Sequence, residues 1–178
     1  MLRLAIMVSG NGSLMQHIYD AINNKQIDAS IEAVIYSKEC KAQQTAESLG
    51  TPCFLYDEKL ESLLDEHEVG LVILAGFTRR LKVPASYQGR IINVHPSLLP
   101  KFGGKGMYGM RVHEKILEAG ETVSGCTVHL VNDEYDSGDI LFQKTCPVLP
   151  QDTAADLRQR VFELEKELLT EAVRSFQD

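Results

Sequence analysis

No two of the four cysteines stand at CxxC spacing. Cys40, Cys53, Cys126 and Cys146 are far apart in the chain, which argues against a zinc ribbon and against a dithiol redox motif. The HExxH spacing of helical zinc sites is missing as well, so we expect no metal. We expect free, reduced thiols, as is typical of a cytosolic protein.

The sequence also lacks a basic stripe and a long apolar run. The formal net charge is −7, whereas proteins that bind a phosphate backbone usually carry a basic stripe, so no nucleic-acid partner is expected. The apolar run near the N-terminus is too short for a signal peptide or a membrane span, which predicts a cytoplasmic protein without a membrane partner. The remaining partners are small molecules, and both a monomer and a homodimer stay open.

Strand and helix patterns alternate in the first part of the chain. Apolar runs predict buried strands at 3–8, 30–36, 53–56 and 71–76. Helical spacing predicts helices at 14–22, 41–49 and 57–67 between them, and Ser13 followed by Gln16 matches a capping box. With 178 residues and 44% hydrophobic content, we expect one domain of the α/β class, with a twisted, mostly parallel sheet and flanking helices.

The last part of the chain has a different pattern of apolar and polar segments. An apolar stretch covers 87–95, a glycine-rich loop follows, and 112–119 has helical spacing. Apolar segments at 123–131 and 139–148 flank a polar segment, which predicts an antiparallel hairpin added to the sheet. A final helix over about 153–176 presents an apolar stripe.

Two segments lie where a parallel sheet binds ligands, beyond the carboxyl ends of strands. The first is SGNGS at 9–13, between a strand and a helix. Its glycines and the free helix N–H groups fit a phosphate, or else a tight turn with glycines for geometry alone. Neither a Walker GxxxxGK nor a full GxGxxG spacing is present, which argues against an ATPase and against dinucleotide binding.

The second segment is NVHPS at 93–97, in which Asn93 and His95 are two residues apart. On extended backbone they point the same way, and together they suit stabilisation of an oxyanion. Taken alone, His95 also fits a hydrogen-bonded structural histidine. Asp136, in an acidic hairpin tip, either lies in solvent or approaches His95, where it would raise the pKa of the imidazole. His129 either supports Asp136 or packs against it.

Four segments together resemble the folate-dependent formyltransferases: SGNGS at 9–13, AGFTRRL at 75–81, NVHPSLLP at 93–100 and DEYDSGDILFQ at 133–143. Their order and spacing match along nearly the whole chain. The glycine turn and the short length point to the branch that formylates glycinamide ribonucleotide in purine biosynthesis. The resemblance implies 10-formyltetrahydrofolate as formyl donor, without a metal. It implies that the nucleotide's amine attacks the formyl carbon, and that a tetrahedral intermediate expels tetrahydrofolate.

The resemblance also implies roles for particular residues. Asn93 and His95 stabilise the oxyanion, and Asp136 holds His95 charged and assists proton transfer. The residues implied in nucleotide binding are Gly12, Ser13 and Leu14 at the phosphate and Glu165 at the ribose. Those implied in folate binding are Arg79, Leu81, Val94 and Asp133, and His129 is a supporting residue. The single domain, 1–178, would thus have a phosphate and nucleotide-binding half, 1–90, and a folate-binding and catalytic half, 91–178.

The chain departs from the family pattern at several places. Leu14 stands where asparagine is common, so only a backbone contact to phosphate is expected there. Phe102-Gly103-Gly104 replaces an aromatic-Pro-Gly segment, which leaves the conformation of the loop open. Lys101 and Lys105 in this loop either supply local positive charge for an anionic substrate or are ordinary loop lysines.

Three other functions remain to be weighed. A formyltetrahydrofolate hydrolase usually has an additional N-terminal regulatory domain, and the first strand here begins at Arg3. A methionyl-tRNA formyltransferase would need a C-terminal nucleic-acid-binding domain and a basic surface. A non-catalytic nucleotide-binding module would use the glycine turn without needing Asn93, His95 and Asp136 together.

Overall fold

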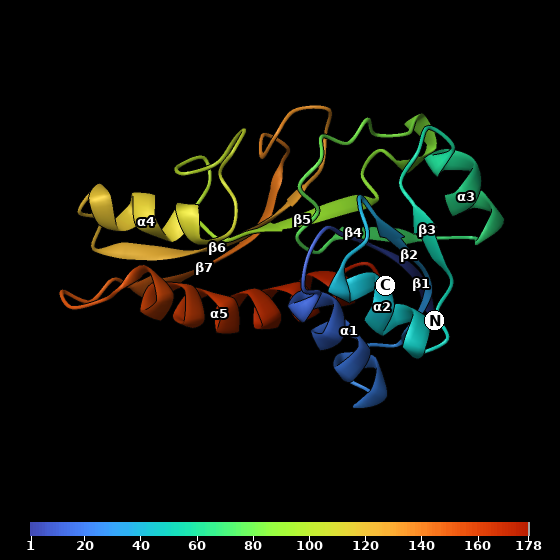
Figure 1. The fold of residues 1–178 in the computed structure, drawn as a ribbon, viewed down its shortest axis with the longest axis horizontal. Coiled ribbons are helices and arrows are strands. Elements are labelled where there is room, and N and C mark those ends of the chain that lie inside the picture. Colours follow the sequence, from blue (N-terminus) through green and yellow to red (C-terminus); the bar gives the residue numbers. More distant parts are fainter. Residues whose placement is uncertain (178) are drawn as a thin grey trace.

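The computed structural model describes residues 1–177, which form a seven-stranded sheet in the order β3-β2-β1-β4-β5-β6-β7 (Figure 1). The strands are β1 (Leu2–Val8), β2 (Ala29–Tyr36), β3 (Cys53–Leu55), β4 (Leu71–Leu74), β5 (Ile91–His95), β6 (Val123–Leu130) and β7 (Ile140–Pro147). The α-helices are α1 (Ser13–Asn23), α2 (Lys41–Ser48), α3 (Leu60–Glu66), α4 (Met110–Glu118) and α5 (Ala154–Arg174), and a 3₁₀ turn, η1, covers Ala85–Tyr87.

The strands from β1 to β5 pair in parallel, whereas β6 and β7 pair antiparallel. This confirms the predicted α/β class and the added hairpin. The register places Asn93 opposite His129 and His95 opposite Thr127. The hairpin therefore brings a second histidine beside the NVHPS segment.

Alternating residues of the strands face two separate cores. Leu4, Ile6 and Val8 of β1 belong to a core with α1, α2, α4 and α5, whereas Ala5 and Met7 belong to a core with α3. Figure 1 shows α5 running beside the sheet, with α3 and α4 toward opposite ends of the molecule. The sheet is thus covered on both faces, which is why its central strands are continuous apolar runs.

One predicted detail of the elements is wrong. Ser13 does not cap α1, because the residue before it, Gly12, is the N-cap in left-handed conformation with φ 77° and no side-chain bond. The apolar stretch 87–95 is split, since η1 ends at Tyr87 and β5 begins only at Ile91. A true capping box begins α5, where Thr153 and Asp156 bond each other's backbone N–H groups.

The order of the strands creates a switch point beside β1. The chain leaves β1 toward β2 on one side and returns to β4 on the other side. The connections after β1 and after β4 therefore diverge and leave a crevice at the carboxyl ends of the strands. The glycine turn at 9–13 and the segment at 75–78 form the two sides of this crevice.

Candidate active site

The glycine turn leaves the start of α1 open toward a cavity of about 560 Å³. Within residues 1–177, no side chain caps this helix end. Gly12, Ser13 and Leu14 all line the cavity. A Cβ on Gly12 would lie 2.6 Å from the Ala42 Cβ, so the turn packs closely against α2. The uncapped N–H groups and the positive end of the helix dipole suit an anion.

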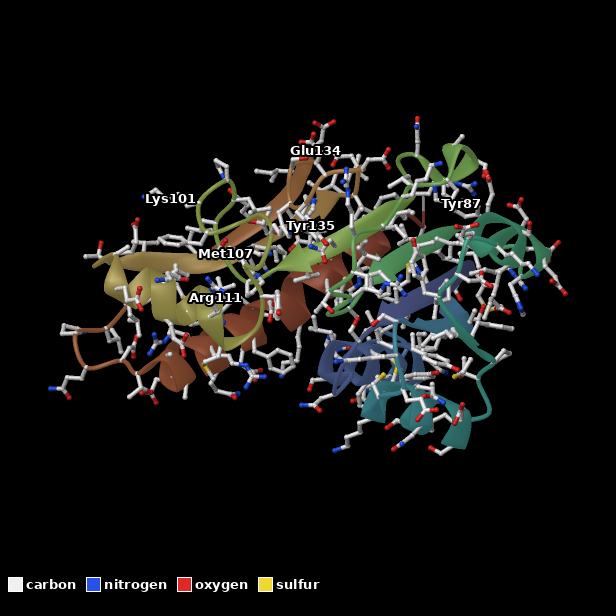
Figure 2. All side chains as sticks on the ribbon, turned by 45° about the horizontal axis from the view of Figure 1, so that its top comes forward. Tyr87, Lys101, Met107, Arg111, Glu134 and Tyr135 are labelled. Atoms are coloured by element: carbon white, nitrogen blue, oxygen red, sulfur yellow. The ribbon has the colours of Figure 1, made fainter. Side chains whose placement is uncertain are left out.

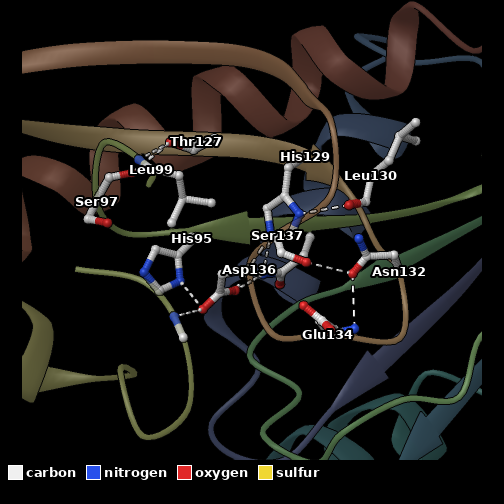
Figure 3. Close-up of polar contacts among 12 residues, drawn as sticks. His95, Ser97, Leu99, Thr127, His129, Leu130, Asn132, Glu134, Asp136 and Ser137 are labelled. Atoms are coloured by element: carbon white, nitrogen blue, oxygen red, sulfur yellow. Dashed lines mark hydrogen bonds and ion pairs between the residues drawn. The ribbon is translucent and has the colours of Figure 1, made fainter. Parts of the chain in front are cut away.

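Asn93, His95 and Asp136 all line the same cavity, and Figure 3 shows Asp136 pointing toward His95. The Asp136 carboxylate lies 3.5 Å from His95 Nδ1 and 3.4 Å from Asn93 Nδ2. It also accepts a 2.8 Å hydrogen bond from the Gly104 N–H. The structure therefore brings together three predicted residues from two separate motifs.

His95 is 4% exposed, and its Nε2 lies 2.8 Å from the Phe102 carbonyl. A carbonyl can only accept, so Nε2 carries a proton, and Nδ1 faces Asp136. Burial lowers the pKa of His95, and the Asp136 charge only partly opposes this effect. The expectation that Asp136 holds the ring charged stays a prediction, because the carboxylate lies 3.5 Å from Nδ1, where it favours the charged form.

His129, on β6, completes the polar cluster, and the expectation that it either supports Asp136 or packs against it stays a prediction. Its Nδ1 donates to the Leu130 carbonyl at 2.8 Å, which leaves Nε2 to accept from Asn93 Nδ2 at 3.1 Å. His129 Nε2 also lies 3.6 Å from Asp136. Burial works to raise the pKa of Asp136, but the contacts to His129, His95 and the Gly104 N–H together hold that pKa below its usual value.

Asp136 reaches the cluster because its loop folds back over β5. Asp136 itself has φ 52°, in the left-handed region. A Cβ on Gly138 would lie 1.8 Å from the Leu130 carbonyl oxygen, so only glycine allows the loop to pack there. Asn132 tightens the same loop by accepting from the Glu134 N–H and the Ser137 hydroxyl (Figure 3).

The segment after His95 is tied to β6 and β7. Thr127 Oγ1 donates to the Ser97 carbonyl at 2.7 Å and accepts from the Leu99 N–H and from Gln143 Nε2. Gln143 Nε2 also donates to the Leu99 carbonyl. This network holds the HPSLLP segment against the hairpin and thereby fixes the position of His95.

The predicted folate-binding residues are divided between two pockets. Arg79, Leu81 and Asp133 line a smaller pocket of about 50 Å³, whereas Val94 lines the large cavity. Asp133 organises the small pocket, because its carboxylate accepts from the Val83 N–H and its carbonyl accepts from Arg80. Four residues line both pockets: Phe77, Asn93, Tyr135 and Asp136.

The loop at 101–110 forms another wall of the large cavity. Lys105 and Met107 line the cavity, whereas Lys101 pairs with Glu121 at 2.7 Å. Only one of the two loop lysines therefore faces the site. Figure 2 shows Met107 and Tyr135 on the two loops that border the cavity.

Glu165 of α5 lines the large cavity with 8% of its surface exposed. This excludes the alternative of a solvated helix glutamate. Burial raises the pKa of Glu165 to about 8, although the Arg158 charge opposes the rise. Sequence reasoning missed Arg158, Phe162 and His113, which line the same cavity. The spacing 158, 162 and 165 places one helix face in the cavity and was a usable signal.

The described residues, 1–177, contain no group of three or more side chains arranged to hold a metal ion. None of the helices in this part of the chain has the length and apolar character needed to cross a membrane.

Comparison with known proteins adds independent findings. Residues 2–173 match the model of the formyl transferase family. The chain is 38% identical to the chloroplastic phosphoribosylglycinamide formyltransferase of Vigna unguiculata, with 97% of this chain and 60% of that protein covered. The chain thus spans less than two thirds of the length of this curated relative.

Solved structures match over more of their length. The glycinamide ribonucleotide transformylase 1 of Symbiobacterium toebii has a TM-score of 0.88 and 33% identity, with 98% of this chain and 86% of that chain covered. The phosphoribosylglycinamide formyltransferase of Brucella melitensis has a TM-score of 0.86 and 36% identity, with 98% and 95% covered.

Proposed function

The chain belongs to the formyl transferase family, and on this premise we propose that it transfers a formyl group from 10-formyltetrahydrofolate to the amine of glycinamide ribonucleotide. The observation that carries the proposal is that Asn93 and Asp136 line both pockets and that His95, in the large cavity, lies 3.5 Å from Asp136. The names of the relatives support the same acceptor.

The two pockets suit two substrates that approach from opposite faces of the sheet. The large cavity lies beside α1 and α5, which pack on one core, whereas the small pocket includes Leu81 and Leu74 of the other core. Asn93 and Asp136 line both pockets. The nucleotide occupies the large cavity and the pterin occupies the small pocket, so that the amine and the formyl carbon meet at the shared residues.

The reaction begins when the neutral amine attacks the formyl carbon. The carbonyl π electrons move to the oxygen, and a tetrahedral intermediate with an oxyanion forms. The nitrogen that attacked loses a proton, the folate nitrogen gains one, and the carbon–nitrogen bond to tetrahydrofolate breaks. The products are the formylated amide and tetrahydrofolate.

His95 and Asn93 serve the oxyanion. Nδ1 of His95 faces the Asp136 carboxylate at 3.5 Å, which favours an imidazolium there, and the positive charge of this ring stabilises the oxyanion. Asn93 Nδ2 is held by His129 at 3.1 Å and by Asp136 at 3.4 Å. The longer contact is the weaker one, so that N–H is the one to redirect toward the oxyanion.

Asp136 moves the proton. Its carboxylate contacts both His95 and Asn93 and lies within the cavity lining. A carboxylate held ionised at this point accepts the amine proton, directly or through one water, and returns it to the leaving nitrogen.

The nucleotide extends from the catalytic residues to the glycine turn. Its phosphate accepts from the backbone N–H groups of Gly12, Ser13 and Leu14, and its ribose lies beside Glu165. On the donor side, Arg79, Leu81 and Asp133 surround the pterin, with Val94 below the formyl group. The division into halves 1–90 and 91–178 is not strict, because Glu165 serves the nucleotide and Arg79 serves the folate.

The test is formyl transfer from 10-formyltetrahydrofolate, followed by absorbance, with and without glycinamide ribonucleotide. Turnover that requires the nucleotide supports the proposal. Equal turnover without it would identify a hydrolase, and no turnover by a folded protein that binds the nucleotide would identify a binding module. His95→Ala should abolish transfer and leave such a module unaffected.

A further inference from the structure

Three polar side chains around one end of the large cavity lack partners within residues 1–177. His113 of α4 is 2% exposed, and its Nδ1 is buried without a hydrogen bond. Glu165 of α5 has no hydrogen bond, and its pKa responds only to burial and to Arg158. Arg158 forms no ion pair in this part of the chain, although Arg160, two residues on, pairs with Asp152 at 2.6 Å.

These three side chains form one group. Arg158, Phe162 and Glu165 follow at i, i+4 and i+7, so they share a face of α5 that borders the cavity. His113 faces them from α4 and lines the same cavity. Arg158 lines the same cavity as His113 and Glu165, and its charge lowers the pKa values of both.

The group offers both donors and acceptors. Arg158 can only donate. Burial, together with the Arg158 and His95 charges, lowers the pKa of His113 to about 4, so the neutral ring has one donor and one acceptor nitrogen. Because burial raises the pKa of Glu165 to about 8, its carboxyl is protonated near neutral pH and offers one donor and one acceptor oxygen. A phosphate, which only accepts near neutral pH, would face the acceptor atoms of two of these groups.

Neighbouring hydroxyls match this combination, because each hydroxyl donates one hydrogen bond and accepts others. We propose that His113 and Arg158, together with Glu165, recognise the vicinal hydroxyls of the acceptor's ribose and set the specificity for a ribonucleotide. This inference rests on the proposed function, which puts the ribose beside Glu165. It adds two specificity-determining residues from α4 and α5.

The experiment compares glycinamide ribonucleotide with its 2′-deoxy and 3′-deoxy analogues. For the wild-type protein, kcat/KM should fall about 10-fold to 100-fold for at least one analogue, because buried polar groups lose their partner. The ribo-to-deoxy ratio is kcat/KM for the ribonucleotide divided by kcat/KM for the deoxy analogue. In Arg158→Gln and in His113→Phe, this ratio should shrink by about fivefold or more. The shrinkage comes from slower turnover of the ribonucleotide, while the deoxy analogue is hardly affected.

The control is Phe162→Leu, which changes the same face of α5 without touching a polar atom. It is expected to leave the ribo-to-deoxy ratio within twofold of wild type, whatever its effect on rate. Arg158 is exposed at the rim, so Arg158→Gln will fold even where His113→Phe does not.

The possible results distinguish a failure of this inference from a failure of the proposed function. Turnover of the ribonucleotide with an unchanged ratio in Arg158→Gln would overturn the inference alone. An effect of this variant confined to KM for the folate donor would overturn it as well. Absence of nucleotide-dependent turnover in the wild-type protein would overturn both the inference and the proposed function.

Discussion

Replacing Glu165 with glutamine should make the protein more stable at alkaline pH. The carboxyl is 8% exposed, and burial raises its pKa to about 8. In the unfolded chain the group titrates near 4.5. Between these two values the folded state holds a proton that the unfolded state has released. The free energy of unfolding therefore falls as the pH rises through this window.

The magnitude follows from the two pKa values. Each pKa unit corresponds to about 1.4 kcal/mol, so Glu165 removes on the order of 4 kcal/mol of stability between pH 5 and pH 8.5. Its stabilising contribution is fully present below pH 4.5 and is lost as the pH rises through about 8. Glutamine has nearly the same shape and cannot ionise, so Glu165→Gln avoids this loss.

Urea denaturation at pH 5, 7 and 8.5 measures the effect. The stability difference between Glu165→Gln and wild type should be near zero at pH 5 and grow with pH to several kcal/mol. The matched control is Glu163→Gln on the exposed side of the same helix, for which the difference should stay within about 0.5 kcal/mol. A pH-independent difference for Glu165→Gln would refute the argument that its carboxyl is buried without a partner.

Three further predictions concern the glycine turn, the HPSLLP segment and the proposed role of the Asp136 carboxylate. Gly12→Ala combines φ 77° with a Cβ placed 2.6 Å from that of Ala42 and should cost about 2 kcal/mol of stability; a loss below 0.5 kcal/mol in urea would contradict this. Thr127→Val leaves the Leu99 N–H and the Ser97 carbonyl without their partner, so a loss of about 2 kcal/mol or more is expected, against less than 0.5 kcal/mol for exposed Thr145→Val. Asp136→Asn keeps the shape but removes the charge, so kcat should fall by about 100-fold or more; retention of a tenth of wild-type kcat would exclude Asp136 as the proton carrier.

Much of the fold is readable from local patterns. The runs 3–8 and 71–76 are continuously apolar because β1 and β4 are covered on both faces by helices. The polar segment between the apolar segments at 123–131 and 139–148 indicated the hairpin. The boundaries shifted by a few residues, because hydrogen bonds at the ends of elements depend on neighbours that a local pattern does not contain.

The start of α1 shows the limit of local motifs. Ser13 and Gln16 have the spacing of a capping box, yet Gly12 takes the N-cap position. The reason is tertiary, since the turn packs against Ala42 of α2 at a distance that leaves room only for glycine. A sequence motif reports which side chains are available for a cap, not which backbone conformation the surrounding structure selects.

Only part of the candidate site could be predicted, again because local patterns do not contain tertiary packing. Asn93 and His95 follow from strand geometry, because residues two apart share a face. That His129 would lie opposite Asn93 depends on the register of β6 on β5, which no local pattern gives. The lowered pKa of His95 reflects how deeply the ring is buried, and sequence proximity to an acidic segment says nothing about burial. His113 and Arg158 belong to no motif at all.

The antiparallel hairpin explains how one end of the sheet borders two pockets. A purely parallel sheet would place ligand-binding loops at the carboxyl ends of its strands, in the crevice beside β1 and β4. Here the connection after β6 starts where the Val131 N–H bonds the Ile91 carbonyl, at the beginning of β5. It folds back along that strand until Asp136 contacts Asn93 and His95. On the way, Asp133 organises the small pocket on one face of the sheet, while Asp136 borders the large cavity.

Lengthening this connection by two glycines after Ser137 should therefore impair both pockets at once. We expect a rise in KM for the donor as well as a fall in kcat, and a change in kcat alone would show that the two pockets are organised independently.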